Sequence, residues 1–208
     1  MKKILSFLFI CTFILGYSQK KELTIEDAVL GYYKGLYPSS LTSLQWVQNS
    51  ENYVFQKENE FVFTDANTKK IVNKINLEDV QKEYPTLKRL PQLQEINATS
   101  LTFRNVNSIE VFNYITNSKI STIFFDVNAE NSEYNSKAKA IAYTLKNNLF
   151  IANATSSKIA VTEIEDKTIV SGQAIHRSEF GIVKGTFWSP EGNYLAFYQK
   201  DESNVTDY

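Results

Sequence analysis

The side chains best suited to chemistry stand near the end of the chain. His176, Arg177 and Glu179 are close together, and Asp201 is followed by Glu202. Taken by itself, Glu179 would be an ordinary surface glutamate, although a carboxylate held in a partly dry cavity can bind an ammonium group through charge-assisted hydrogen bonds. Two adjacent carboxylates could share acid and base roles only if apolar surroundings raised one pKa. No hydrophobic residue adjoins Asp201 and Glu202, so we expect both of them in a solvated loop.

The inventory of reactive side chains excludes several kinds of site. The chain has one histidine, His176, and one cysteine, Cys11, so it can form neither a disulfide nor a zinc site of several His or Cys ligands. The Gly-x-Ser-x-Gly elbow of serine hydrolases is absent, as are a Gly-rich phosphate loop and a dinucleotide fingerprint. We therefore expect no catalytic residue, metal or cofactor here. We interpret His176 as a partly buried polar residue that holds its segment.

The charge balance argues against a nucleic-acid partner, and the composition favours a β-rich fold. The net charge is -1, from 22 basic and 23 acidic residues, and this balance provides no basic surface for nucleic acid. Aromatic residues make up 13% of the chain, with 12 Tyr and 14 Phe, a composition that favours β-strands.

The first residues have the composition of a targeting segment. Lys2 and Lys3 precede an apolar run over residues 4–15, and small residues stand before a cleavage point at Gln19. This order is typical of a secretory signal peptide, which we place at residues 1–18. We expect an exported protein, periplasmic or secreted.

The rest of the chain reads as short strands that must position these side chains. Thr24 can cap a helix over residues 23–34, within an N-terminal helical segment at 19–43. Strands follow at 43–47, 53–55, 61–63 and 71–75, and four such antiparallel strands have the size of one propeller blade. Residues 78–82 could form a helical turn, and the polar stretch 128–139 is predicted to be a loop. Further strands are expected at 100–104, 109–115, 119–127, 140–144 and 149–151.

A weak internal repeat supports blades. The segment from Trp46 to Phe55 resembles the one from Trp188 to Phe197, since each has a Trp, a polar turn and an apolar strand. Their separation fits three units of about 47 residues, although coincidence between two hairpins would also explain it. We predict an all-β fold, a partial propeller of about three blades and the start of a fourth over residues 44–208. In this fold Phe187 and Trp188 would belong to a blade core.

The C-terminal third carries a family resemblance. The runs 176–182, 185–198 and 201–208, with Ser178-Glu179-Phe180 before Trp188-Ser189-Pro190, are similar to the dipeptidyl peptidase IV family of serine exopeptidases. The resemblance is strong over 140–208, moderate over 23–63 and weak over 77–128. It implies a closed propeller on an α/β-hydrolase domain, with glutamates that bind the free N-terminus of peptide substrates. The hydrolase domain would lie beyond Tyr208, so we expect an N-terminal fragment.

The resemblance also assigns roles. Glu179 takes the position of an amine-binding glutamate of the family's Glu-Glu-Phe motif, and Ser178 replaces the first glutamate. Release of tripeptides as well as dipeptides, usually after proline, therefore stays open. Arg177 could contact substrate carbonyl groups or be a solvated surface residue. The oligomeric state is also open, a homodimer of the full-length protein included. The alternative interpretation is a non-catalytic, exported, β-rich binding module.

Overall fold

The computed structural model describes residues 22–38, 40–176 and 179–205. The chain divides into two units, Met1–Ser40 and Leu41–Tyr208. The predicted signal peptide lies outside the described residues. Within the described ranges, no helix is long and apolar enough to cross a membrane.

The first unit contains a short helix, α2 (Ile25–Leu30). Thr24 caps it as predicted, because its hydroxyl accepts a hydrogen bond from the Asp27 N–H at 3.0 Å and the Asp27 carboxylate accepts one from the Thr24 N–H at 3.4 Å. The helix is much shorter than the predicted 23–34, since turns follow from Gly31. Glycine and aromatic residues are poor helix formers, and Gly31 is followed by two tyrosines.

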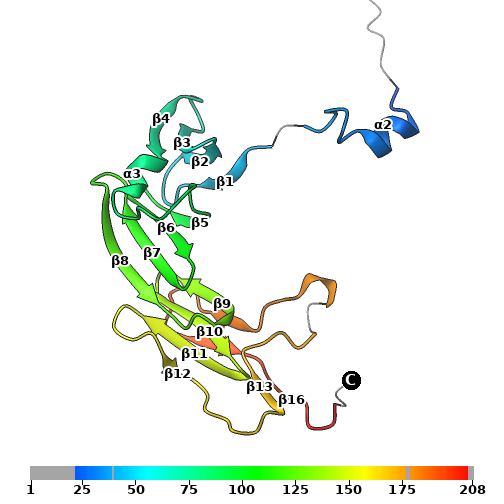
Figure 1. The fold of residues 1–208 in the computed structure, drawn as a ribbon, viewed down its shortest axis with the longest axis vertical. Coiled ribbons are helices and arrows are strands. Elements are labelled where there is room, and N and C mark those ends of the chain that lie inside the picture. The colour runs from blue at the N-terminus through cyan, green and yellow to red at the C-terminus, as the bar shows by residue number, and fades with distance from the viewer. Residues whose placement is uncertain (1–21, 39, 177–178, 206–208) are drawn as a thin grey trace, which may run out of the picture. The chain divides into compact units, whose positions relative to one another are not determined.

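The second unit contains three four-stranded antiparallel sheets, each built from strands consecutive in the sequence (Figure 1). The first has β1 (Thr42–Trp46), β2 (Asn52–Lys57), β3 (Glu60–Asp65) and β4 (Ile71–Asn76); the second, after helix α3 (Leu77–Gln81), has β5 (Leu93–Ile96), β6 (Ser100–Asn105), β7 (Ser108–Asn113) and β8 (Ser118–Phe124); the third has β9 (Glu130–Asn135), β10 (Ala140–Leu145), β11 (Asn148–Asn153) and β12 (Ile159–Ala160). The predicted all-β, unclosed propeller is confirmed.

Two shorter pairs complete the described fold. The strand β13 (Ile169–Ser171) pairs with β16 (Gln199–Asp201), and β14 (Thr186–Trp188) pairs with β15 (Leu195–Phe197). In the first sheet Trp46 pairs with Tyr53, and in the later hairpin Trp188 pairs with Leu195. The two segments of the sequence repeat therefore form hairpins of the same register.

The average length of the repeat was predicted correctly, but the packing of its aromatic residues was not. The sheets and the later hairpin begin at Thr42, Leu93, Glu130 and Thr186, so the three units average 48 residues although their individual lengths differ. The ring of Phe187 is not buried as blade core: it is 38% exposed and packs edge-on against Tyr198. Trp188 is only partly buried.

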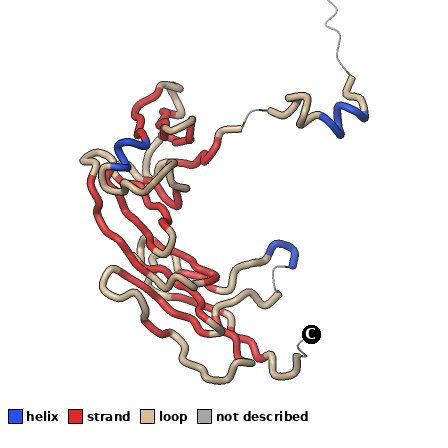
Figure 2. Tube along the Cα trace, viewed as in Figure 1, coloured by secondary structure: helices blue, strands red, loops and turns tan. Residues whose placement is uncertain are grey.

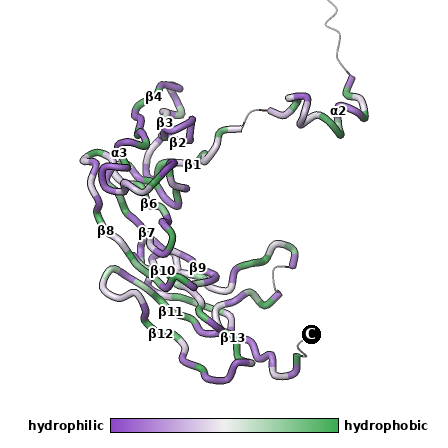
Figure 3. The backbone as a smooth tube through the Cα atoms, in the orientation of Figure 1, coloured by the Kyte–Doolittle hydropathy of each residue, from purple (hydrophilic) through white to green (hydrophobic). Residues whose placement is uncertain are grey.

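Hydrophobic side chains pack between successive sheets. One buried cluster joins the first sheet, α3 and the second sheet through residues such as Phe61, Phe103 and Phe112. A second joins the second sheet to the third through Ile123 and Tyr143, among others. Figure 3 shows hydrophobic and hydrophilic residues in turn along most of the strands of these sheets.

The polar stretch predicted as a loop contains a strand. The strand β9 pairs along β10, with Tyr134 opposite Ile141 and Glu133 opposite Ala142. Backbone hydrogen bonds form a sheet whatever the polarity of the side chains. Only Tyr134 of this strand is packed against the hydrophobic cluster, so the apolar signal that reveals most strands is nearly missing here.

Candidate functional site

The segment that carries Glu179 is a loop whose two ends meet. It joins β13 to β14 over residues 172–185, and we call it the Glu179 loop. The Gly172 N–H donates to the Tyr198 carbonyl at 2.8 Å, and the Tyr198 N–H donates to the Gly185 carbonyl at 2.9 Å. A Cβ at Gly185 would lie 2.3 Å from the Gln173 carbonyl carbon. Because only glycine allows this approach, the loop closes into a narrow base.

The described tip of the loop is one short 3₁₀ turn, Glu179–Gly181. The Glu179 N–H donates to the His176 carbonyl, and the Ile182 N–H donates to the Glu179 carbonyl, each at 2.9 Å. Figure 2 shows this turn as a short helical segment at the end of the loop. Phe180 adopts a φ of 53° and is 98% exposed, so the tip combines a left-handed residue with an unburied ring.

The structure describes two of the four residues singled out in this segment. Glu179 is exposed at the tip, as a group that contacts a ligand must be. Arg177 and Ser178 lie outside the described residues. His176 is exposed, so its interpretation as a partly buried residue is wrong.

The returning end of the loop is tied to β9 through Glu133. Lys184 Nζ lies 2.6 Å from Glu133 Oε1, and Thr186 Oγ1 donates to Glu133 Oε2 at 2.7 Å. The indole N–H of Trp188 donates to the Glu133 backbone carbonyl at 3.3 Å. Sequence reasoning missed Glu133 because it lies in the stretch predicted as a loop, where nothing distinguishes it from other surface glutamates.

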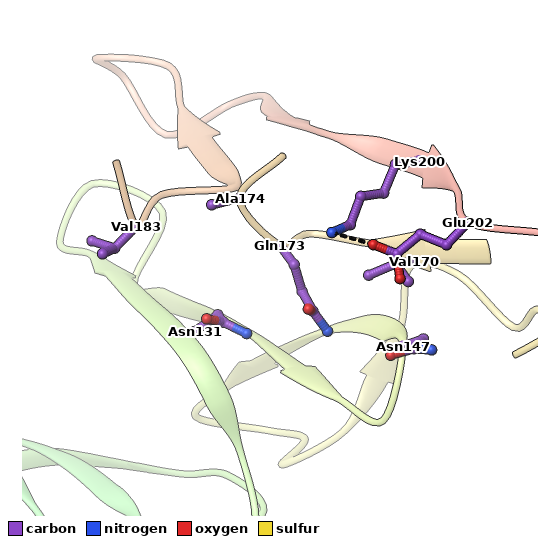
Figure 4. Close-up of a pocket in the computed structure, with 8 residues that line it drawn as sticks. All are labelled: Asn131, Asn147, Val170, Gln173, Ala174, Val183, Lys200 and Glu202. Atoms are coloured by element: carbon purple, nitrogen blue, oxygen red, sulfur yellow. Dashed lines mark ion pairs between the residues drawn. The ribbon is translucent and has the colours of Figure 1, made fainter. Parts of the chain in front are cut away.

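A polar pocket of about 500 Å³ lies at the base of the loop. In the view of Figure 4, Gln173 extends between Asn131 and Asn147, and Lys200 pairs with Glu202 near Val170. The Lys200–Glu202 ion pair measures 2.7 Å and is mostly shielded from solvent, with side chains 16% and 23% exposed. The lining therefore combines amide groups with one ion pair.

The two adjacent carboxylates do not form an acid–base pair. Asp201 ends β16, and its carboxylate accepts a hydrogen bond from the Ser203 N–H at 2.8 Å, a contact that lowers the pKa of Asp201. Asp201 is solvent-exposed as expected, but it ends a strand, and Glu202 follows that strand with its side chain mostly shielded against Lys200, so the expectation of a solvated loop is met only in part by each residue. The lowered pKa of Asp201 is the opposite of what a general acid needs. Among the described residues, no group of three or more His, Cys, Asp or Glu side chains could hold a metal.

Residues 93–208, more than half of the chain, match the sequence family described as the dipeptidyl peptidase IV (DPP IV) N-terminal region. The chain belongs to this family. The match covers part of the stretch over 77–128 where the sequence resemblance was weak. The family predicted from the Ser178-Glu179-Phe180 and Trp188-Ser189-Pro190 segments is thus confirmed.

Solved structures and a curated relative agree with this assignment. A protein assigned as a dipeptidyl aminopeptidase IV from Bacteroides ovatus is 32% identical, with a TM-score of 0.69, over 91% of this chain and 27% of that one. The dipeptidyl peptidase 4 of Porphyromonas gingivalis is 17% identical, with a TM-score of 0.53, over 91% and 29% of the two chains. Dipeptidyl aminopeptidase B of Saccharomyces cerevisiae is 29% identical over 125 residues, 57% of this chain and 15% of the yeast protein. The chain spans less than a third of each relative's length.

Proposed function

We propose that this chain is the N-terminal propeller part of an exported serine exopeptidase that releases N-terminal dipeptides or tripeptides, usually after proline. The observation that carries the proposal is the family membership of residues 93–208. The peptide bond would be cut by serine, histidine and aspartate side chains of an α/β-hydrolase domain outside this sequence. Export would depend on residues 1–18, and the complete protein could act as a homodimer.

Within this scheme Glu179 binds the free α-amino group of the substrate. An ammonium group needs charge-assisted acceptors, and a carboxylate at the tip of a loop with a closed base provides one at a defined place. Binding the amine there sets its distance from the nucleophile, which in turn selects the length of the released peptide. Because Ser178 stands in place of the first glutamate of the motif, the longer tripeptide product is included. Arg177 would contact a substrate carbonyl group.

The exposed ring at the tip supports a functional role. Phe180 adopts a positive φ, as nine other non-glycine residues of the described chain do, but its ring is almost fully exposed. A large apolar side chain held in solvent is more informative here than the backbone angle. The exposed ring beside Glu179 is therefore a second group at the tip with a role in contact rather than in the core.

The test is the Glu179→Gln substitution in the full-length protein, assayed with Gly-Pro and Ala-Pro chromogenic substrates. Loss of one charge-assisted contact, worth about 1.5–3 kcal/mol, should lower kcat/KM by about 10- to 150-fold. Glu191→Gln provides the control, because Glu191 is an exposed glutamate in the turn between β14 and β15 and carries the same change of charge. A kcat/KM equal to that of the control would refute the amine-binding role of Glu179. Absence of any peptidase activity in the full-length protein would refute the wider proposal.

A further inference from the structure

We propose that Glu133, on β9, is a positioning residue that anchors the returning end of the Glu179 loop and so sets where the Glu179 carboxylate is presented. The anchoring rests only on contacts between described residues. Its consequence for peptide binding rests on the proposed function of Glu179.

The contacts that carry this inference converge on one side chain. Lys184, Thr186 and Trp188 alternate along the chain as it enters β14, so their side chains point to the same side of an extended backbone. Each of the three reaches Glu133: the two carboxylate oxygens bind Lys184 and Thr186 separately, and the backbone carbonyl binds Trp188. Glu133 is 22% exposed at its side chain, and Thr186 is buried.

The contact of Glu133 with Lys184 lies on the part of the loop between its base and its tip. The base of the loop is closed by backbone hydrogen bonds at Gly172 and Gly185, but Ile182 and Val183 are 45% and 62% exposed. Among the described residues that return from the tip, Lys184 is the first whose side chain is tied to another strand. The Lys184–Glu133 ion pair therefore extends the fixed part of the loop beyond its base, toward Glu179.

The chain offers a matched control pair. Lys74 and Glu60 also form an ion pair at 2.6 Å, between β3 and β4, with side chains 47% and 33% exposed. The corresponding exposures are 54% and 22% for Lys184 and Glu133. Glu60→Gln therefore removes an ion pair of the same length and similar exposure at a site in the first sheet, with no part in the Glu179 loop.

The first experiment measures amide hydrogen exchange at residues 179–185 in the full-length protein. We expect Glu133→Gln to speed exchange there by about five- to tenfold, and Glu60→Gln to leave these residues unchanged. The charge-swapped variant that combines Glu133→Lys with Lys184→Glu should return exchange toward the original rate, because it restores the ion pair. Equal exchange in Glu133→Gln and in the unsubstituted protein would overturn the anchoring role.

The second experiment separates positioning from a general loss of stability. We expect Glu133→Gln to lower kcat/KM for a dipeptide substrate with a free amine by about tenfold. In the Glu179→Gln background the same substitution should change kcat/KM by less than about twofold, since the group that it positions is no longer an amine-binding carboxylate. Equal losses in both backgrounds would overturn the positioning role. If Glu179→Gln alone has no effect, the proposed function fails, while the exchange experiment still decides whether Glu133 anchors the loop.

Discussion

A buried carboxylate in the second sheet provides a sharp test of how this fold is held together. Glu110, on β7, is 4% exposed and accepts three hydroxyl hydrogen bonds: from Tyr84 at 3.2 Å, Ser108 at 2.7 Å and Thr122 at 2.6 Å. Burial, together with the nearby Glu110, raises the pKa of the Tyr84 phenol, so the phenol keeps its proton for this contact. We expect Glu110→Leu to destabilise the protein because it fills the space but removes the acceptor.

The magnitude follows from which hydroxyl groups lose their partner. Ser108 keeps a second acceptor, the Asn105 carbonyl at 2.9 Å, whereas Tyr84 and Thr122 lose the acceptor described for them. An unsatisfied buried donor such as Tyr84 costs about 1–3 kcal/mol, the partly buried Thr122 costs less, and the added apolar burial of leucine offsets part of the loss. We therefore expect Glu110→Leu to lower the free energy of unfolding by about 2–4 kcal/mol.

A second substitution tests the cause. Tyr84→Phe keeps the ring packed against Phe103 and Phe112 and removes only the hydroxyl. It should cost about 1–2 kcal/mol in the original protein, yet less than about 0.5 kcal/mol with leucine at position 110, where the phenol has lost its acceptor. Urea unfolding followed by circular dichroism would measure all four variants of the cycle, with Glu163→Leu as the exposed control. An equal cost of Tyr84→Phe in both backgrounds would show that the carboxylate does not satisfy this hydroxyl.

Two further predictions concern pH and backbone packing. Burial raises the pKa of the Tyr114 phenol to about 12, whereas the same phenol in the unfolded chain has a pKa of about 10. The protonated phenol therefore contributes fully to stability below about pH 10. This contribution is lost as the pH rises toward about 12, at up to about 1.4 kcal/mol per pH unit. Urea titrations at several alkaline pH values measure how steeply the free energy of unfolding falls with pH. The fall should be smaller in Tyr114→Phe than in the original protein, and unchanged in Tyr194→Phe, where the tyrosine is 78% exposed. The same slope in Tyr114→Phe and in the original protein would contradict the prediction. Gly185→Ala should destabilise the protein by more than Gly181→Ala. The added Cβ meets the Gln173 backbone at 2.3 Å in the first case, whereas in the second it meets open space and adds only the strain of a φ of 75°. Equal unfolding midpoints would show that the loop base opens without cost.

The strands could be predicted from the sequence where their side chains have an apolar pattern that indicates burial. The strands of the first sheet and the hairpin at 140–151 alternate or concentrate apolar residues, and their predicted positions agree with β1–β4, β10 and β11. The strand β9 has no such pattern, since its pairing with β10 rests on backbone hydrogen bonds. Propensity also failed at the N-terminus, where the cap at Thr24 was predicted correctly but the end of α2 was not.

Of the candidate site, one residue could be predicted from the sequence and one could not. Glu179 could be found because a motif of neighbouring residues, up to Trp188, marks it in the sequence. Glu133 could not be found, because its partners stand about 50 residues later and its role arises only when β9 and β14 come together. A local motif can mark a residue proposed to contact a ligand, whereas the residues proposed to hold it in place are distant in sequence and have ordinary types.

The strained tip and the anchored base of the Glu179 loop explain one another. A non-glycine residue at positive φ persists only where the surrounding structure determines the backbone, and the exposed ring of Phe180 makes no buried contact that could do so. The described contacts that hold this backbone are the two hydrogen bonds of the 3₁₀ turn and, at the base, the backbone hydrogen bonds to Tyr198, the close approach at Gly185 and the contacts of Glu133. If any of these contacts is removed, we expect the backbone to open first at Phe180 and Glu179, because the least stable part of a structure opens first. We therefore expect the site to respond also to substitutions of residues that never touch a substrate.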